Sequence, residues 1–588
     1  MAVSRLFANV VRDLLTDWAL AEHQIPDSQF GFCPTRNTIQ PLFVLRHILA
    51  TAKKEKRKVY TAFLDLLAAY DSIPRERLWE HLQKIRTPQY LRDIIQTMYR
   101  GCLYLLVDGD KFSEEVAPNR GLKQGCPLSP LLYSLYTNDI DRFLDVQKGA
   151  VTALDPVKVP HCDYADDIAL TSNTAENLQF QLDRIYAYTR FKGLKLNTDK
   201  TKVMVFFSND TYAVSTFRYN GTPLELVNEF KYLGIILTRS GKMHTATAKM
   251  ADTFRNAIAR VFKTGDNKGI KHRKHAMLWL FQVFALTAGL YGCQIWATSF
   301  LTYDSSKTTS AHVLHVGFLK QLLGVKKGTD THSLLRETGQ VPIFFYWFRC
   351  TVRFWNSLLS SNNLLLEKVV RADLLLANRS DTWTYQVLHA LQDLPASHQL
   401  LDAIRSRESI NLKQFELTLR EHIIGGWREL DILTPHEAHH SSRIMRTYHT
   451  HFGVPLGTAP GWWDDKKRNH KPVLPLYLRK DLSSNLSRAL SCLRLSCHNF
   501  LVQKMRHARN RIPYELRICD KCDWHIVQDE EHVLLDCPHE QLVSLRTQHQ
   551  LFFPPQYEDS TTRLRNFMNQ PDVSGVASFV AKCLALFP

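Results

Sequence analysis

Apolar residues at helical spacing alternate with short, strand-like apolar runs in the first part of the chain. The spacing predicts amphipathic helices over 1–24 and 39–52, and the run Val59–Leu64 predicts a buried strand that ends in an acid, Asp65. Further elements follow: helices over 74–85, 89–99, 131–143 and 174–192, a hairpin over 104–116, and strands over 202–207 and 230–237. From 243 to 505 the pattern is mostly helical. The pattern therefore predicts an α+β region followed by helical regions.

The stretch His161–Leu170 places two adjacent carboxylates, Asp166 and Asp167, between two apolar strands. An Asp-Asp step suits a tight turn, so we expect a hairpin with both acids at its tip. Two like charges beside a core are electrostatically costly, and a divalent cation would offset that cost. Asp65 is the predicted third carboxylate, although only the fold can bring it near the hairpin. The order strand, helix, two strands, helix, strand predicts a split-βαβ arrangement.

Glycines punctuate the segment Arg120–Pro130, which lies between these acids in the sequence. Gly121 and Gly125 allow the backbone to approach a ligand closely. Ser129 followed by Pro130 predicts an N-cap with proline at the first helical position.

Three motifs in fixed order make the pattern specific. They are Phe63-x-Asp65 with Ala69-Tyr70-Asp71, then Gly121-x-x-Gln124-Gly125 with Ser129-Pro130, then Tyr164-Ala165-Asp166-Asp167. Together they resemble the palm of a reverse transcriptase, most of all that of the non-LTR (LINE-type) retrotransposons. Flanking motifs are similar too: Gln29–Phe32 with Arg36, Gly193–Asn197 with Lys200, and Phe230–Gly234.

The resemblance implies a right-hand polymerase with five parts. Residues 1–242 would hold a fingers remnant and the palm, 243–345 a helical thumb, 346–505 a helical connector, 506–545 a zinc knuckle and 546–588 a tail. The implied activity is that of an RNA-directed DNA polymerase, a nucleotidyltransferase that extends a DNA primer on an RNA template by two-metal phosphoryl transfer.

Individual residues take roles by the same resemblance. Asp65 and Asp166 would bridge two Mg²⁺ ions, with Asp167 and the Leu66 carbonyl as further ligands. Tyr70 would lie under the sugar and select deoxynucleoside triphosphates, although it also fits a plain core tyrosine. The implied contacts to nucleotide, template or phosphate are Gln124, Gly125, Arg36 and Lys200, of which the two cations also fit an ordinary surface.

The sequence departs from the family at several points. Cys33 stands where the family often has a basic residue, and Leu67 where it often has a polar or basic one. The upstream fingers strands and an endonuclease are missing from the pattern, so we expect a truncated copy whose endonuclease comes from another chain or a missing domain. Two alternatives stay open: a catalytically impaired RNA-binding remnant, and a group II intron-type maturase.

A cluster near the C-terminus has the ligand spacing of a tetrahedral zinc site, Cys519-x-x-Cys522 followed by His532 and Cys537. Its flanks are basic, with Arg506, Arg509, Arg511 and Arg517. We predict a structural zinc knuckle that helps to bind RNA. His525 or His539 is an alternative to His532, and three free thiols in a loop are the alternative to a metal site.

A second formal metal motif, His-Glu-x-x-His, runs from His436 through Glu437 to His440. The residues after it are polar, and neither a glycine nor a third histidine follows at the extended protease spacing. We therefore expect a solvated helix end there and no protease.

The chain of 588 residues carries a net charge of +17, which favours a polyanionic partner such as nucleic acid. Its 12 cysteines are mostly solitary in apolar segments, as expected of reduced thiols. The uncharged stretch Ala276–Phe300 is interrupted by glutamines and glycines, so it predicts a buried thumb helix with its exit and no membrane partner. Action in the nucleus is implied by the resemblance alone.

Overall fold

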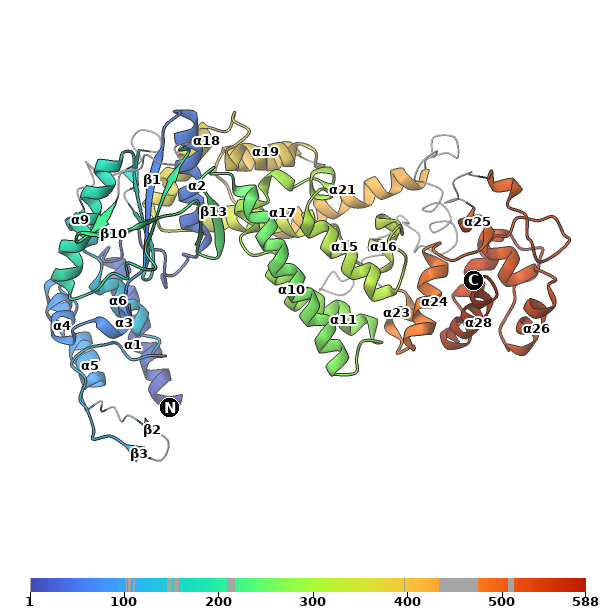
Figure 1. The fold of residues 1–588 in the computed structure, drawn as a ribbon, viewed down its shortest axis with the longest axis horizontal. Helices are drawn as coiled ribbons and strands as arrows, with labels where there is room; N and C mark the ends of the chain where they lie inside the picture. The colour runs from blue at the N-terminus through green and yellow to red at the C-terminus, as the bar shows by residue number, and fades with distance from the viewer. Residues whose placement is uncertain are drawn as a thin grey trace.

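The computed structural model describes residues 2–101, 103, 107–108, 111–144, 151–152, 158–159, 161–208, 217–395, 397–432, 474–505 and 512–588. Figure 1 shows an elongated molecule, with the sheet and the N-terminus at one end and the C-terminal helices at the other. The long helix α10 (Ala246–Asn267) lies between the two ends.

The central sheet has five strands in the order β11-β8-β1-β7-β6. Strand β1 (Val59–Leu64) lies in the middle and pairs antiparallel with β7 (Asp167–Ser172) and β8 (Lys202–Phe206). β6 (His161–Tyr164) and β7 form the predicted hairpin, and β11 (Glu225–Leu226) adds a parallel edge. Because β1 separates β7 from β8, the predicted split-βαβ order is confirmed.

Both faces of this sheet are covered, because alternate side chains of each strand point to opposite faces. Phe63, Met204 and Phe206 lie in one core with helix α2 (Ile39–Lys54). Leu64 and Val203 lie in the other core, with helices α4 (Arg75–Lys84), α6 (Ser129–Tyr136) and α9 (Ala175–Lys192). The remaining helices of this part are α1 (Ala2–Ala21), α3 (Ala69–Ser72), α5 (Gln89–Tyr99) and α7 (Ile140–Phe143). Its short strands are β2 (Val107–Asp108), β3 (Lys111–Phe112), β4 (Val151–Thr152), β5 (Lys158–Val159), β9 (Arg218–Tyr219), β10 (Thr222–Pro223), β12 (Glu229–Tyr232) and β13 (Ile235–Thr238).

The helix expected over 131–143 differs from the prediction in two ways. It breaks into α6 and α7, and Ser129 is its first helical residue, not its N-cap. The Ser129 hydroxyl donates to the Lys123 carbonyl at 2.7 Å, so it fastens the glycine-bearing loop and does not cap the helix.

The stretch 276–300 was predicted as a helix with its exit, and the structure has a helical run up to Gly289 with a π-helical turn inside it. Helix α11 (Lys274–Leu280) continues into a π-helical turn, η2 (Phe281–Leu286), and then into α12 (Thr287–Gly289). Gly292 adopts a left-handed conformation with φ +67°, which ends this segment before α13 (Cys293–Trp296). Among the described residues, no helix is both long enough and apolar enough to cross a membrane.

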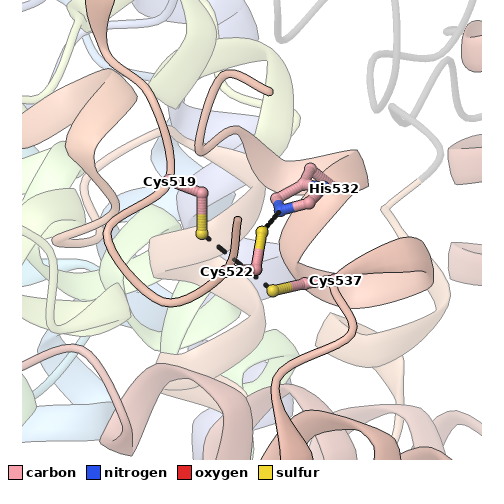
Figure 2. Close-up of side chains that lie close together, drawn as sticks. All are labelled: Cys519, Cys522, His532 and Cys537. Atoms are coloured by element: carbon pink, nitrogen blue, oxygen red, sulfur yellow. Dashed lines mark hydrogen bonds between the residues drawn. The ribbon is translucent and has the colours of Figure 1, made fainter. Parts of the chain in front are cut away.

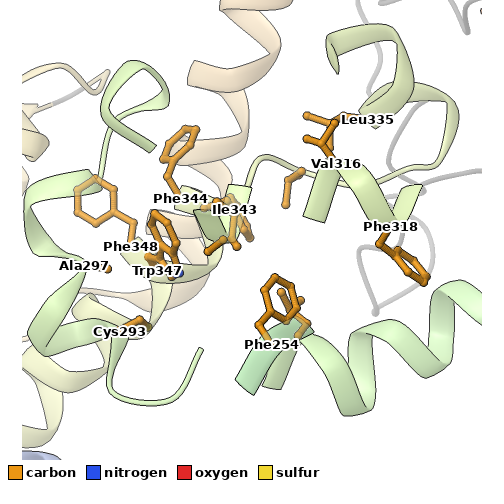
Figure 3. Close-up of a cluster of buried hydrophobic side chains, with 14 of the residues drawn as sticks. Phe254, Cys293, Ala297, Val316, Phe318, Leu335, Ile343, Phe344, Trp347 and Phe348 are labelled. Atoms are coloured by element: carbon orange, nitrogen blue, oxygen red, sulfur yellow. The ribbon is translucent and has the colours of Figure 1, made fainter. Parts of the chain in front are cut away.

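The helices after β13 pack around one continuous apolar core. Figure 3 shows the part of this core around Phe254, Phe318 and Trp347. Its remaining elements up to residue 432 are η1 (Met243–Thr245), η3 (Thr298–Phe300), α14 (Tyr303–Ser306), α15 (Ser310–Leu323), α16 (Thr331–Glu337), α17 (Ile343–Leu359), α18 (Leu364–Leu375), α19 (Trp383–Gln392), α20 (Ser397–Arg405) and α21 (Leu412–Ile432). The predicted boundary between residues 345 and 346 falls inside α17. His47 of α2 bonds to Asp373 of α18 at 3.0 Å in a fully buried contact, which fastens this part to the sheet.

The C-terminal part begins with α23 (Leu476–Arg479), α24 (Ser484–Arg494) and α25 (Leu501–Lys504) and continues with η5 (Tyr514–Leu516), η6 (His532–Asp536), α26 (Glu540–Gln548), α27 (Ser560–Met568) and α28 (Val573–Ala585). Helix α28 packs on α24. Buried side chains of the predicted tail, such as Phe567 and Phe579, lie in the same core as Val533 and Leu535 beside the cysteine cluster. The predicted tail therefore packs against the segment that holds the predicted zinc ligands.

Candidate active site

The register of β1 and β7 brings the three predicted carboxylates together. Leu64 pairs with Ile168, so the next residues along, Asp65 and Asp167, face each other where the strands end. Tyr164 pairs with Asp167, which leaves Ala165 and Asp166 as the two-residue turn of the hairpin. Three acids from two distant segments thus lie at one end of the sheet, near enough for their charges to act on one another.

The electrostatics of these acids agree with a shared site. Partial burial raises the pKa of Asp166, and the charge of Asp65 raises it further. Burial raises the pKa of Asp167 as well, with added contributions from Asp166 and Asp65. None of the three makes a salt bridge within the described part of the chain. Three mutually repelling carboxylates without a cationic side chain suit an oxygen-binding divalent ion.

The position of Asp65 is fixed by the loop that follows α9. Its N–H donates to the Thr201 hydroxyl at 3.1 Å, and its carbonyl accepts from the Asn197 N–H at 2.8 Å. Leu66 pairs with Leu196 in an antiparallel bridge, and the Leu67 N–H donates to the Lys195 carbonyl. In such a bridge the neighbours of Leu66 make the hydrogen bonds, so its own carbonyl points away from that loop.

A cavity of about 540 Å³ opens beside the carboxylates. Tyr70, Gln124, Gly125 and Asp166 all line it. The Tyr70 ring stacks on Tyr133 with a centroid separation of 4.9 Å. The Tyr70 hydroxyl is buried and makes no hydrogen bond to any described residue, and burial raises its pKa.

Two further contacts shape this cavity. The Gln124 amide donates to both carboxylate oxygens of Asp71, at 3.2 and 3.1 Å. Gly125 has φ +74°, a conformation that favours glycine. The structure therefore brings Tyr70, Gln124 and Gly125 to the same cavity as Asp166, as the motifs predicted, while their roles stay predictions.

The two residues predicted to contact phosphate, Arg36 and Lys200, differ in their exposure to solvent. The Arg36 guanidinium donates to the carbonyls of Pro26 and Gln29 at 2.6 and 2.5 Å, and its side chain is only 5% exposed. Arg36 therefore fixes the segment before it, and its contact to phosphate stays a prediction. Lys200 is exposed in the loop that holds Asp65, and its phosphate contact stays a prediction.

The two departures from the family lie near the site. Cys33 is buried and its thiol donates to the Gly31 carbonyl at 3.2 Å. Leu67 is half exposed, at 50%, next to Leu66, whose carbonyl is a predicted ligand. Neither side chain offers a cation there.

The sequence reasoning missed a charge network around the buried His161 of β6. The His161 ring lies between two carboxylates, with Nδ1 2.8 Å from Asp163 and Nε2 2.5 Å from Asp141. Burial alone would lower the pKa of His161, but these carboxylates more than offset burial and raise it to about 10. The alternation of His161 and Asp163 on one face of the strand was the available signal.

The cysteine and histidine side chains predicted as zinc ligands converge, as Figure 2 shows. The ligand atoms of Cys519, Cys522, His532 and Cys537 all lie within 4.8 Å of one another. Cys519 Sγ is 4.0 Å from Cys537 Sγ, and Cys522 Sγ is 3.3 Å from His532 Nε2. With zinc–sulfur distances of about 2.3 Å, the edges of a tetrahedron are roughly 3.8 Å, so these side chains fit the metal.

The structure also places some of the other residues that the sequence offered as metal ligands or as basic flanks. His525 and His539 are not part of it, so His532 is the histidine that the structure brings together with the cysteines. Arg517 is buried and donates to the carbonyls of Ile512 and Val502, so it is not a surface cation. The other basic flanks (Arg506, Arg509, Arg511) and the motif of His436, Glu437 and His440 lie outside the described residues.

The split-βαβ sheet with three carboxylates at the end of its central strands defines a polymerase palm. In agreement, residues 2–237 match the family described as reverse transcriptase (RNA-dependent DNA polymerase). This part of the chain is a reverse transcriptase domain. Its relatives are RNA-directed DNA polymerases of non-LTR retrotransposons, which does not favour the maturase or the RNA-binding remnant.

Two relatives illustrate the similarity. The Retrovirus-related Pol polyprotein from type-2 retrotransposable element R2DM of Drosophila melanogaster is 31% identical over 232 residues, which cover 38% of this chain and 22% of that protein. The RNA-directed DNA polymerase from mobile element jockey of Drosophila funebris is 30% identical over 244 residues, which cover 40% and 26%. The chain thus spans about a quarter of the length of these relatives. A solved structure, apo telomerase from Candida tropicalis, has a TM-score of 0.31 at 11% identity over 71% of this chain and 61% of that one, too weak a likeness to argue from.

Proposed function

We propose that the chain is an RNA-directed DNA polymerase of a LINE-type retrotransposon, which extends a DNA 3′ end on an RNA template. The observation that carries the proposal is the meeting of Asp65, Asp166 and Asp167 beside a cavity lined by Tyr70 and Gln124. RNA template, DNA primer and deoxynucleoside triphosphates are the proposed substrates, and the net charge of +17 supports polyanionic partners.

The proposed metal ligands are Asp65, Asp166, Asp167 and the Leu66 carbonyl. Their oxygen atoms and the lack of a salt bridge among the described residues support Mg²⁺, which prefers a few carboxylates together with phosphates and water. When bound, two Mg²⁺ ions would lower the pKa of the primer 3′-hydroxyl and stabilise the leaving pyrophosphate.

The cavity residues position the nucleotide in this proposal. The Tyr70 ring, held flat by its stack on Tyr133, forms an apolar floor that would exclude a 2′-hydroxyl. Gln124 and the left-handed backbone at Gly125 would contact the nucleotide and template. Lys200, next to the Asp65 loop, would contact a phosphate. Positioning of this kind supplies much of the catalysis in phosphoryl transfer.

Primer extension on poly(rA)/oligo(dT) with Mg²⁺ tests the proposal. Wild type should incorporate dTTP, whereas Asp166→Asn, which keeps the shape and removes the charge, should not. Asp199→Asn, which removes an exposed carboxylate of the neighbouring loop, is the matched control and should behave as wild type. Equal incorporation by wild type and Asp166→Asn would end the polymerase proposal, and an inactive wild type that still binds RNA would identify a remnant.

We also propose a structural zinc ion at Cys519, Cys522, His532 and Cys537, in a module that helps to bind RNA. The converging ligand atoms support it. So does a buried glutamine behind them: the Gln528 amide donates to Cys519 Sγ at 3.5 Å and to Asp520 at 2.7 Å, while its oxygen accepts from the Leu501 N–H at 2.8 Å. Such outer contacts orient metal ligands.

Two further parts of the proposal rest on the resemblance to the LINE-type family alone. We propose that an endonuclease from another chain or from a further domain acts with this one, as the resemblance to LINE-type retrotransposons implies. Action in the nucleus, where a chromosomal DNA 3′ end is found, follows from the same proposal.

A further inference from the structure

A short segment before α2 lies along the free edge of the catalytic hairpin. Gln29 forms a parallel bridge with Asp163 of β6. The Phe30 N–H donates to the Asp163 carbonyl at 2.7 Å, and the Asp163 N–H donates to the Ser28 carbonyl at 2.8 Å. Residues 28–30 therefore extend the sheet by one short strand next to the turn that carries Asp166.

The side chain of Gln29 reaches the turn itself. Its Oε1 atom accepts from the Ala165 N–H at 3.0 Å and from the Gly31 N–H at 2.8 Å. Gln29 is 3% exposed, so both bonds are shielded from water. One amide oxygen thus joins the segment to the first residue of the two-residue turn.

The turn needs such a partner because its backbone is unfavourable. Ala165 has φ +60°, a left-handed conformation that an alanine rarely adopts. Residues in such conformations persist only when their surroundings hold them there. Without an acceptor, the Ala165 N–H would be buried and unpaired, and the turn would relax toward another conformation.

Gly31 allows the segment to come this close. A Cβ atom at Gly31 would lie 2.3 Å from the Ala165 nitrogen and 2.9 Å from the Tyr164 carbonyl carbon, both backbone atoms. Arg36 fixes the backbone of this segment, because its guanidinium donates to the Gln29 carbonyl and to the Pro26 carbonyl. Arg36, Gln29 and Gly31 therefore form a chain of contacts that ends on the catalytic turn.

We propose that Gln29 is a positioning residue for the metal-binding carboxylates. It holds the Ala165–Asp166 turn in the conformation that directs Asp166 toward Asp65, and it does so through its amide oxygen alone. The role in catalysis rests on the proposed polymerase function, whereas the effect on the turn does not.

Hydrogen exchange of the peptide 161–168, which contains the turn and ends before Ser172, tests the effect on the turn without any turnover. In Gln29→Leu, which keeps the volume and removes the acceptor, we expect exchange in this peptide to be faster by about tenfold or more, as for a lost buried hydrogen bond. Gln29→Glu keeps an acceptor oxygen and should restore protection. Gln181→Leu is the matched control, because Gln181 is also fully buried and its oxygen accepts from the Ser172 hydroxyl at 2.8 Å, away from the turn.

The Mg²⁺ concentration for half-maximal primer extension tests the consequence for catalysis. We expect Gln29→Leu to raise it by about tenfold or more, while Gln181→Leu leaves it unchanged even if it lowers the unfolding temperature. Gly31→Ala, whose Cβ would press on the Ala165 nitrogen from the same segment, should also raise it.

The outcomes separate the two proposals. Wild-type exchange at 161–168 in a folded Gln29→Leu protein would overturn the positioning role, whatever the activity. Faster exchange together with an unchanged Mg²⁺ midpoint would overturn the link to metal binding. Faster exchange in Gln29→Leu, together with a wild type that shows no Mg²⁺-dependent extension, would leave Gln29 as the residue that holds the turn and would end the polymerase proposal.

Discussion

Leu64 of β1 lies directly opposite Ile168 of β7, and this single pairing aligns Asp65 with Asp167. A shift by one residue would turn Asp65 to the other face of the sheet, because side chains alternate along a strand. The buried neighbours Phe63 and Leu170 pin the register, since each faces a different core.

The first prediction is that Asp65 and Asp166 act as one unit. Asp65→Asn and Asp166→Asn should each lower single-turnover incorporation by about 10³-fold or more, and the double variant should be no slower than either, because residues that act as a unit are strongly non-additive. Rapid-quench primer extension measures this. Multiplicative losses would show that the two carboxylates act separately.

The second prediction concerns the sugar of the nucleotide. Tyr70→Ala should admit ribonucleotides, raising the ratio of kcat/KM for rNTP over dNTP by about tenfold or more. Tyr70→Phe is the control: the hydroxyl makes no hydrogen bond to described residues, so the ring alone should preserve discrimination. A loss of discrimination in Tyr70→Phe would assign the selectivity to the hydroxyl.

The third prediction is a pH dependence of stability from His161, which faces Asp141 and Asp163. The pKa of His161 is about 10 in the folded chain, above its ordinary value of 6.5. The imidazolium therefore stabilises the fold fully below pH 6.5, and this contribution is lost as the pH rises through 10.

Thermal unfolding of wild type and His161→Gln at several pH values checks this dependence. The difference in unfolding temperature should be largest at or below pH 6.5 and should shrink toward pH 10. A gap that stays constant over that range would show that His161 is not charged in the folded chain.

The fourth prediction concerns the zinc cluster. One zinc per chain should be measured by atomic absorption after purification without chelator, and Cys522→Ala should lose it. His525→Ala should keep it, since His525 is outside the cluster. Loss of the metal should also lower the unfolding temperature of the C-terminal helices, because Cys537 and Leu535 belong to their core. Full zinc in Cys522→Ala would mean that other residues bind it.

The fifth prediction concerns the stability contributed by a buried ion pair that joins α16 to α24. Arg494 Nε lies 2.5 Å from a Glu337 carboxylate oxygen, and the Glu337 side chain is 0% exposed. Glu337→Gln leaves a buried guanidinium without its counter-charge, so it should lower the free energy of unfolding by about 3 kcal/mol or more. Glu229→Gln breaks the exposed pair with Lys249 and should cost under about 1 kcal/mol. Similar losses in a denaturant titration would contradict the role of burial.

Local sequence was enough for the elements and for the identity of the carboxylates. Val59–Leu64, Gln89–Tyr99 and the hairpin at Asp166 have spacing and turn residues that determine their conformation within a few positions of themselves. The four zinc-ligand candidates were likewise readable, because metal-ligand spacing is a local property.

Tertiary structure decided the partners of these side chains. Arg36 could be seen as a cation in the sequence, but only packing showed that its Nη1 donates to two backbone carbonyls and that its Nη2 lies 3.6 Å from Asp27. The Gln29 contact to Ala165 joins residues that the sequence separates widely, and the packing of α28 on α24 brings the tail under the zinc cluster. Such contacts depend on the relative placement of distant elements, which the local pattern of apolar and polar residues does not encode.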